Sequence, residues 1–200
     1  DAVVVVGGRT GADGIHGATF SSESLNENSP ATAVQIGDPI TQKKMADMLT
    51  EARNLGLYNS ITDNGAGGLS CSVGEMAKES GGAELHLEKV PLKYSGLHPW
   101  EILLSEAQER MTLSVPEDNV DQFLELAKRR DVEATVIGKY TDDGRFRTFY
   151  EGKPVSDLDM GFLHDGAPRK KMKATWKQHS YEEPEFEEPE TDWALKTLLS

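Results

Sequence analysis

Apolar and polar residues recur along the chain at two spacings, one typical of strands and one typical of helices. Residues 2–6 form an unbroken run of alanine and valine, which predicts a buried strand. Residues 38–55 repeat apolar side chains every three or four positions, which predicts a helix with one buried face. Asp38 is placed to cap the start of this helix, Pro39 fits its first position and Gly56 fits its end.

The remaining segments alternate between short strands and helices. Residues 135–140 and 145–150 have strand-like patterns, and Asp142-Asp143-Gly144 between them predicts a hairpin turn. Mixed elements with several short antiparallel connections favour the α+β class over a doubly wound parallel sheet. By the same criteria we expect helices over residues 69–79, from residue 100 and over 120–130, and strands over residues 58–62, 83–87, 110–115 and 155–158.

After residue 168 the sequence changes character. Five basic side chains between residues 169 and 177 are followed by six glutamates between residues 182 and 190, with prolines among them. Segregated charge with little apolar content is typical of an extended linker. We therefore expect a domain over residues 1–168, a charged linker over 169–191 and the start of a further, helical segment over 192–200. Because no methionine precedes the first strand and the last helical pattern stops abruptly at Ser200, we also expect both ends to be cuts in a longer polypeptide.

The composition excludes several classes of protein. The 200 residues include one cysteine, so a fold built on internal disulfides is excluded. No apolar run approaches the ~18 residues of a membrane-spanning helix, and no signal peptide stands at the start. The net charge of −13 argues against general binding of nucleic acid or of anionic membranes. An anionic small molecule remains compatible, because backbone N–H groups and Mg²⁺ can supply a local positive field.

Five glycines within residues 7–17 predict a loop whose backbone can approach a ligand closely. The loop lacks the spacing of a P-loop and of a dinucleotide-binding motif. It forms either a backbone cradle for a phosphate or substrate, or a tight turn. His16 is either an acid–base group or a histidine bonded to backbone. The candidates for ligand contact in this loop are Gly8, Thr10, Gly11, Gly14 and His16.

A second glycine loop follows the strand that ends near Asp63. A helix is expected to begin directly after it, and backbone N–H groups at a helix start favour phosphate. Asp63 is a candidate ligand for Mg²⁺, a hard cation that proteins bind through one or two carboxylates. The alternative is an aspartate that only caps the loop. The glycines of this candidate site are Gly65, Gly67 and Gly68.

Three further positions carry polar chemistry beside apolar segments. Residues 105–110 (SEAQER) form either a site or a solvated helix end with a Glu–Arg pair. Gln35, within an apolar stretch, is either a satisfied strand residue or a ligand contact. Cys71 has no basic neighbour in the sequence, so we expect it to pack against other residues rather than to act as a nucleophile.

Four segments, taken together, resemble one enzyme family. They are GGRTGADGIHGATFSS (7–22), VQIGDP (34–39), ITDNGAGGLSCSVGEM (61–76) and LSEAQERM (104–111). In order and spacing, residues 1–168 resemble the formylglycinamide ribonucleotide amidotransferase family, the phosphoribosylformylglycinamidine synthases of purine biosynthesis. The resemblance implies the C-terminal domain of the first of two synthetase halves, a type shared with aminoimidazole ribonucleotide synthetase. Its fold would be α+β and layered, with a mixed β-sheet and a distant likeness to ferredoxin-like topology.

The resemblance also implies a reaction. These carbon–nitrogen ligases convert formylglycinamide ribonucleotide (FGAR), ATP and glutamine-derived ammonia to formylglycinamidine ribonucleotide, with Mg²⁺ as cofactor. By this likeness Asp63 would bind Mg²⁺, and no catalytic residue would lie in this chain. Ala107 stands where many members have serine, and Asn64 where methionine is common, so the role of a side chain at position 107 is open. The residues that match substrate contacts are Gln35, Glu106, Ala107 and Gln108.

The implied partners are the rest of a larger enzyme. They comprise an N-terminal domain and a second half in the same polypeptide, a glutaminase subunit or domain, a small bridging subunit and the phosphorylated ribonucleotide, in the cytoplasm. Apolar surface that these parts would cover is expected to allow self-association of the fragment. Two alternatives remain: a domain of a related ATP-binding enzyme, such as aminoimidazole ribonucleotide synthetase or selenophosphate synthetase, and a non-catalytic binding module.

Overall fold

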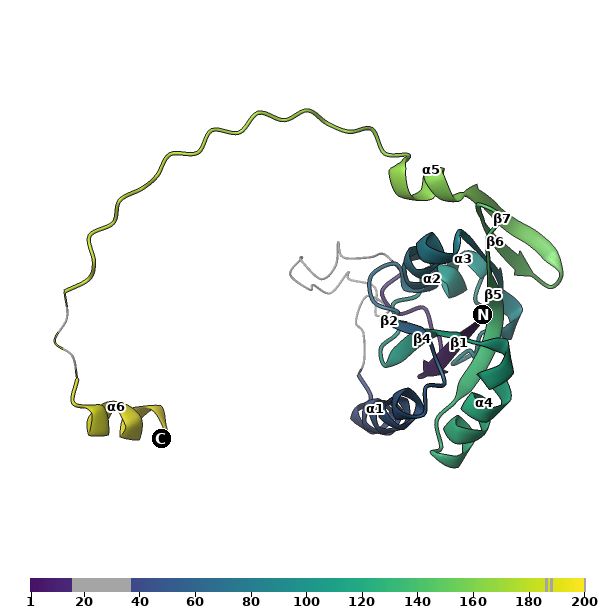
Figure 1. Ribbon diagram of the computed structural model, residues 1–200, viewed down its shortest axis with the longest axis horizontal. Coiled ribbons are helices and arrows are strands. Elements are labelled where there is room, and N and C mark those ends of the chain that lie inside the picture. Colours follow the sequence, from purple (N-terminus) through teal and green to yellow (C-terminus); the bar gives the residue numbers. More distant parts are fainter. Residues whose placement is uncertain (16–36, 186, 188, 200) are drawn as a thin grey trace. The chain divides into compact units, whose positions relative to one another are not determined.

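The computed structural model describes residues 1–15, 37–185, 187 and 189–199. The chain divides into two units, Asp1–Ala167 and Pro168–Ser200. The first unit is built on one seven-stranded sheet in the order β2-β4-β1-β5-β3-β6-β7 (Figure 1). Its strands are β1 (Ala2–Gly7), β2 (Ser60–Asp63), β3 (Gly82–His86), β4 (Arg110–Val115), β5 (Ala134–Thr141), β6 (Arg145–Tyr150) and β7 (Lys153–Asp159). Its α-helices are α1 (Pro39–Asn54), α2 (Gly68–Ser80), α3 (Pro99–Leu104), α4 (Val120–Arg129) and α5 (Met160–Asp165).

The sheet is mixed. β3 and β6 run parallel to each other, whereas the other neighbouring strands run antiparallel. A mixed sheet with helices packed on it confirms the predicted α+β class.

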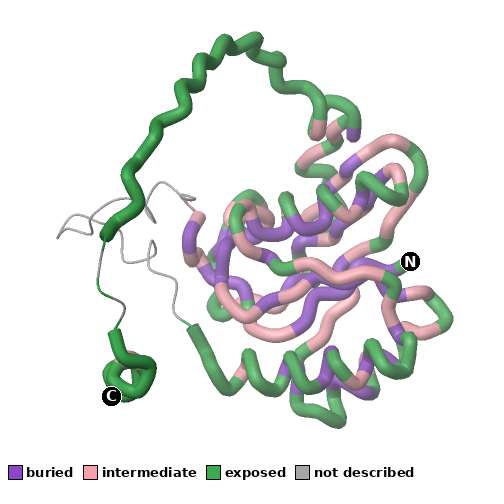
Figure 2. The backbone as a smooth tube through the Cα atoms, turned by 60° about the vertical axis from the view of Figure 1, so that its left-hand side comes forward, coloured by how far each residue is buried: buried purple, intermediate pink, exposed green. Residues whose placement is uncertain are grey.

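The inner strand β1 is buried on both faces, as its unbroken apolar run predicts (Figure 2). Successive side chains of a strand point to opposite faces. Val4 and Val6 therefore pack in one core with α1 and α4, whereas Val3 and Val5 pack in a second core with α2 and α3. The result is three layers, with helices covering both faces of the sheet (Figure 1).

The termini of α1 follow the predicted capping. The Asp38 carboxylate accepts from the backbone N–H groups of Ile40 and Thr41, and Pro39 occupies the first helical position. Gly56 follows the helix with a φ of +67°, the left-handed conformation that favours glycine. The spacing of apolar residues therefore predicted this helix to within one residue at its C-terminal end.

The hairpin predicted at Asp142-Asp143-Gly144 is wrong. β5 and β6 flank β3 instead of pairing with each other, because β3 inserts between them. The strands approach so closely that a Cβ on Gly82, at the start of β3, would lie 2.6 Å from the carbonyl oxygen of Arg145. The two-residue hairpin of this region lies between β6 and β7, where Glu151 and Gly152 both have positive φ.

The second unit is simple. From Pro168 to Glu190 the described residues form no helix or strand and are exposed, and α6 (Thr191–Leu198) follows. This agrees with the absence of apolar spacing there, and the division into linker and further segment stays a prediction. Among the described helices of the whole chain, none is long and apolar enough to cross a lipid bilayer.

Candidate functional site

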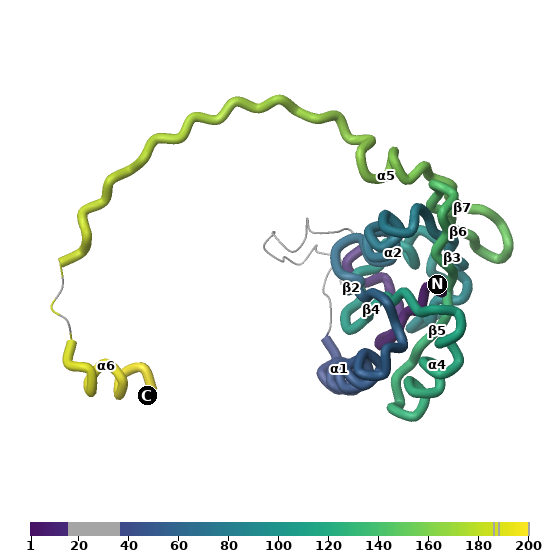
Figure 3. Tube along the Cα trace, in the orientation of Figure 1, coloured from purple at the N-terminus to yellow at the C-terminus, as the bar shows by residue number. Residues whose placement is uncertain are grey.

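Three of the singled-out segments meet at one end of the sheet. Gly7, the last residue of β1, lies opposite Arg110, the first residue of β4. Asp63, the last residue of β2, lies opposite Met111 on the other side of β4. The two glycine loops and residues 105–110, here called the SEAQER segment, therefore emerge side by side although about fifty residues separate each from the next (Figure 3).

The first glycine loop is hydrogen-bonded to the SEAQER segment along its backbone. The N–H of Gly8 donates to the carbonyl of Glu109 at 2.8 Å, and the N–H of Glu106 donates to the carbonyl of Asp13 at 2.8 Å. A Cβ on Gly8 would lie 3.0 Å from the carbonyl oxygen of Gln108. Gly8 therefore allows the two backbones to approach closely, and a side chain there would force one of them to shift.

The second glycine loop closes on the same segment. The N–H of Gly67 donates to Oε1 of Glu106 at 3.1 Å. Gly68 has a φ of +54°, and a Cβ there would lie 2.2 Å from the carbonyl oxygen of Ser105. The N–H of Gly65 donates to Asp63, and that of Gly68 to the carbonyl of Gly65. In this conformation these three N–H groups donate within the chain, so the phosphate contact predicted for them stays a prediction.

Arg110 is buried at the centre of the SEAQER segment, with 3% of its surface exposed. Its Nε donates to the carbonyl of Ala107 at 2.8 Å, and its Nη2 to the carbonyl of Ser105 at 2.5 Å. Its Nη1 donates to Oγ1 of Thr10 at 2.9 Å. The alternative of a solvated helix end is therefore wrong, because α3 ends at Leu104 and the segment folds around this side chain.

Burial lowers the pKa of Arg110 to about 10, and the negative charge of Asp13 opposes that shift. The guanidinium is still protonated near neutral pH. A buried cation is costly unless its donors are bonded, and here each of the three nitrogens has its own acceptor.

The SEAQER segment places its other side chains differently. Glu106 is 7% exposed and Ala107 1%, so a side chain at position 107 faces the interior. The N–H of Ala107 donates to Oγ of Ser105 at 3.2 Å. Gln108 is half-buried, and its Nε2 lies 3.3 Å from the carbonyl oxygen of Glu106. Gln35 and His16, the other two side chains singled out, lie outside the described residues.

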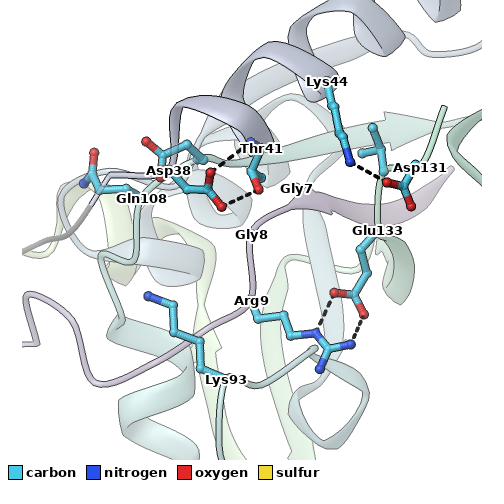
Figure 4. A pocket seen from close by; sticks show the side chains of 12 residues that line it. Gly7, Gly8, Arg9, Asp38, Thr41, Lys44, Lys93, Gln108, Asp131 and Glu133 are labelled. Carbon is cyan, nitrogen blue, oxygen red and sulfur yellow. Dashed lines mark hydrogen bonds and ion pairs between the residues drawn. The ribbon is translucent and has the colours of Figure 1, made fainter.

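A cavity of about 340 Å³ adjoins the SEAQER segment at Gln108 (Figure 4). Nε of Arg9 lies 2.8 Å from Oε2 of Glu133, and this carboxylate raises the pKa of Arg9. Lys44 is paired with Asp131 in the same way. These ion pairs offset much of the positive charge that the cavity would offer to an anion.

Asp63 fits the requirements of a magnesium ligand. Asp63 is exposed at the end of β2, and its Oδ1 accepts from the N–H of Gly65 at 2.8 Å. Among the described residues no three His, Cys, Asp or Glu side chains gather as a metal cage. Mg²⁺ is commonly held by one or two carboxylates, with water and substrate phosphate completing its shell. A lone, accessible aspartate therefore suits Mg²⁺ better than it suits zinc.

Two polar features at this end of the sheet escaped the sequence analysis. Asn64 is 3% exposed, and its Oδ1 accepts from Oγ1 of Thr112 at 2.6 Å. Oγ of Ser72 lies 3.2 Å from the same Thr112 oxygen. The second feature is the burial of Arg110, which the sequence offered only as half of a solvated Glu–Arg pair. The sequence signal for the cluster of Asn64, Ser72 and Thr112 was a threonine within an apolar strand. This signal is weak, because threonine is common in strands.

Cys71 does not pack in the core as predicted; it is exposed on α2. Its Sγ donates to Oε1 of Glu75 at 3.3 Å. Partial burial, then Glu75 and Asp63, raise the pKa of the thiol. A raised pKa keeps the sulfur protonated near neutral pH, which agrees with the prediction that it is not a nucleophile.

Comparison with known proteins places this site in context. The family profile described as AIR synthase related protein, C-terminal domain, matches residues 1–151. A curated relative, the phosphoribosylformylglycinamidine synthase subunit PurL of Methanopyrus kandleri, is 42% identical over 208 residues. That alignment covers all of this chain, whereas the chain spans 28% of the relative's length.

Solved structures give the same assignment. T. maritima PurL complexed with FGAR matches 98% of this chain with a TM-score of 0.80 and 30% sequence identity, and 33% of that protein is covered. T. maritima PurL complexed with ATP matches 98% of the chain with a TM-score of 0.76 and 27% identity, and 31% of it is covered. The resemblance inferred from four sequence motifs and the predicted fold class are therefore confirmed.

Proposed function

The chain belongs to the family of AIR synthase related protein C-terminal domains, and on that basis we propose that it forms one wall of the active site of a phosphoribosylformylglycinamidine synthase. The observation that carries the proposal is the convergence of two glycine loops and the SEAQER segment at one end of the sheet. The solved relative complexed with FGAR has the same fold over nearly the whole chain.

Within this proposal, the SEAQER segment binds the ribonucleotide. Glu106 and Gln108 supply side-chain contacts, and Gln35 is the third such side chain. Ala107 contributes by shaping the segment, because its side chain is buried and its N–H and carbonyl bond within the segment to Ser105 and Arg110. The replacement of serine by alanine at this position is then expected to leave substrate binding intact.

The chemistry is an ATP-dependent amidation. An amide oxygen is a poor leaving group, and phosphorylation by ATP makes it a good one that ammonia can displace. Bound Mg²⁺ would offset the charge of the transferring phosphoryl group. Asp63 would hold that ion beside the second glycine loop, and the exposed carboxylate leaves room for water and phosphate.

The chain alone does not complete such a site. It spans less than a third of the curated PurL subunit, whose name marks it as part of an assembly. We propose that the remaining synthetase domains and a glutaminase supply the catalytic residue, most ATP contacts and the ammonia, in the cytoplasm. The isolated 200-residue chain is then inactive.

A hybrid synthetase tests the function. In it, this chain replaces the matching segment of the M. kandleri PurL subunit, and FGAR, ATP, Mg²⁺ and ammonium chloride are supplied. We expect ADP and formylglycinamidine ribonucleotide from the hybrid, and neither from the chain alone or from the subunit with this segment deleted. ATP cleavage that depends on formylglycinamidine ribonucleotide, and not on FGAR, would instead favour the aminoimidazole ribonucleotide synthetase alternative. A folded hybrid that cleaves no ATP with either substrate would favour a non-catalytic module.

A further inference from the structure

We propose that Arg110 is a positioning residue, which holds the SEAQER segment against Thr10 in the conformation that binds the ribonucleotide. The proposal rests on the proposed function, because it concerns the segment assigned there to substrate binding. It adds a residue that touches neither substrate nor metal and acts through Glu106 and Gln108.

The contacts of Arg110 join two parts of the chain. Two of its nitrogens bond to the carbonyls of Ser105 and Ala107, on either side of Glu106. The third bonds to the hydroxyl of Thr10 in the first glycine loop, a hundred residues away in sequence. One planar side chain therefore fixes the backbone on both sides of a proposed substrate contact relative to a second loop.

Thr10 is a firm anchor for this link. It is 1% exposed, its N–H donates to the carbonyl of Pro91 and its carbonyl accepts from the N–H of Lys93, both at 2.8 Å. A parallel bridge to Leu92 lies between these bonds. Because its backbone is held in this way, the Thr10 hydroxyl offers a fixed point to which Arg110 can tie the segment.

The segment needs such a link because it has no regular structure of its own. It connects the end of α3 to the start of β4, and Glu109 within it has a φ of +55°. Ser105 and Ala107 are almost fully buried, so their carbonyls have little access to water. An unpaired buried carbonyl is costly, and the guanidinium, with five donors in a rigid fork, satisfies both carbonyls at once.

Kinetics of the hybrid synthetase test the proposal, with Arg110→Lys and Thr10→Val as the two variants. Lysine keeps the charge but cannot span three separated acceptors in one plane, and valine keeps the size of threonine without its hydroxyl. We expect the KM for FGAR to rise at least tenfold in Arg110→Lys and severalfold in Thr10→Val, with the KM for ATP unchanged. In the double variant we expect the KM for FGAR to rise by less than the product of the two single-variant increases, because both substitutions break the same link.

A core substitution separates positioning from simple loss of stability. Phe123→Leu weakens the core under α4, on the other side of the sheet from α2 and α3. It is expected to lower the melting temperature and leave both KM values unchanged. An Arg110→Lys variant that behaves like Phe123→Leu would overturn the proposal, and so would an unchanged KM for FGAR in Thr10→Val if Arg110→Lys does not fold. Failure of the proposed function is distinct, because it appears in the unsubstituted hybrid as an absence of FGAR-dependent turnover.

Discussion

The backbone N–H of Gly67 donates to the Glu106 carboxylate across 3.1 Å, although 39 residues separate them. Gly67 is the N-cap of α2, and its φ of 78° turns its N–H toward the SEAQER segment. Helix N-termini favour negative charge, so α2 orients the carboxylate that we assign to substrate binding. The second glycine loop thus acts on the site through Glu106 as well as through Asp63.

The charge of Glu106 is expected to matter more for binding than for folding. In Glu106→Gln the amide oxygen can still accept from Gly67, and only the attraction between the charge and the N-terminus of α2 is lost, so we expect a small fall in melting temperature. A hydrogen bond to a charged group contributes about 1.5–3 kcal/mol. Loss of such a bond between Glu106 and the ribonucleotide would raise the KM of the hybrid synthetase for FGAR roughly tenfold to a hundredfold. Glu117→Gln, an exposed position with the same change in charge, serves as control. Equal KM values for the two variants would contradict a binding role.

Two glycines with positive φ provide a matched test of close packing. Gly68 and Gly56 have φ values of +54° and +67°, but a Cβ on Gly68 meets the Ser105 carbonyl oxygen at 2.2 Å, whereas one on Gly56 meets nothing within 4 Å. Left-handed backbone costs an alanine about 1–2 kcal/mol at either position. We expect Gly68→Ala to cost about 1–3 kcal/mol more, from overpacking. Urea unfolding of the two variants measures this difference. Equal losses in the free energy of unfolding would show that the SEAQER segment shifts to accommodate the added methyl group at little cost.

The sequence predicted the elements whose burial follows a simple local pattern. α1 carries its core positions at regular intervals and β1 is an unbroken apolar run, and each of these local patterns was sufficient to locate its element. It failed at Asp142-Asp143-Gly144, because a turn signal describes only the residues beside it. The insertion of β3 between β5 and β6 is a contact between distant segments, which no local pattern contains.

The candidate site was predicted only in part, because its segments are marked by local patterns but its contacts join distant parts of the chain. Glycine loops and polar residues beside strands mark places where backbone and ligand approach, so the loops and the SEAQER segment were singled out. The burial of Arg110 was not predicted, because charged side chains usually lie in solvent. Its burial depends on acceptors at Thr10, Ser105 and Ala107 that come together only in the fold. The exposure of Cys71 was not predicted for a similar reason, since it depends on which segments pack against α2 in the fold.

The cap of α1 predicts a pH dependence of stability. Side-chain and backbone hydrogen bonds from Thr41, and a weaker one from Ile40, lower the pKa of Asp38 below its usual 3.8. A lowered folded-state pKa stabilises the protein at pH values above the unfolded pKa, and this contribution is lost as the pH falls through the folded value. Asp38→Asn still caps the helix but does not titrate. We expect the difference in melting temperature between the two proteins to stay constant from pH 7 to about pH 5 and to change only as the pH falls below about 4, through the lowered pKa of Asp38. A difference that stays constant below about pH 4 as well would contradict the assignment.

Removal of the Asp63 carboxylate is expected to raise the concentration of Mg²⁺ that the hybrid synthetase requires. Asp63→Asn keeps an oxygen that can accept from Gly65, so the loop should keep its conformation while the ligand loses its charge. Since Mg²⁺ prefers anionic oxygen, we expect the hybrid synthetase to need about tenfold more Mg²⁺ for half-maximal rate, a change typical of a weakened metal site. Asp121→Asn, in the first turn of α4, is the control for net charge. Magnesium titrations of both variants, after removal of metal with a chelator, provide the measurement. Superimposable curves would mean that Asp63 serves only to cap the glycine loop, the alternative that the sequence left open.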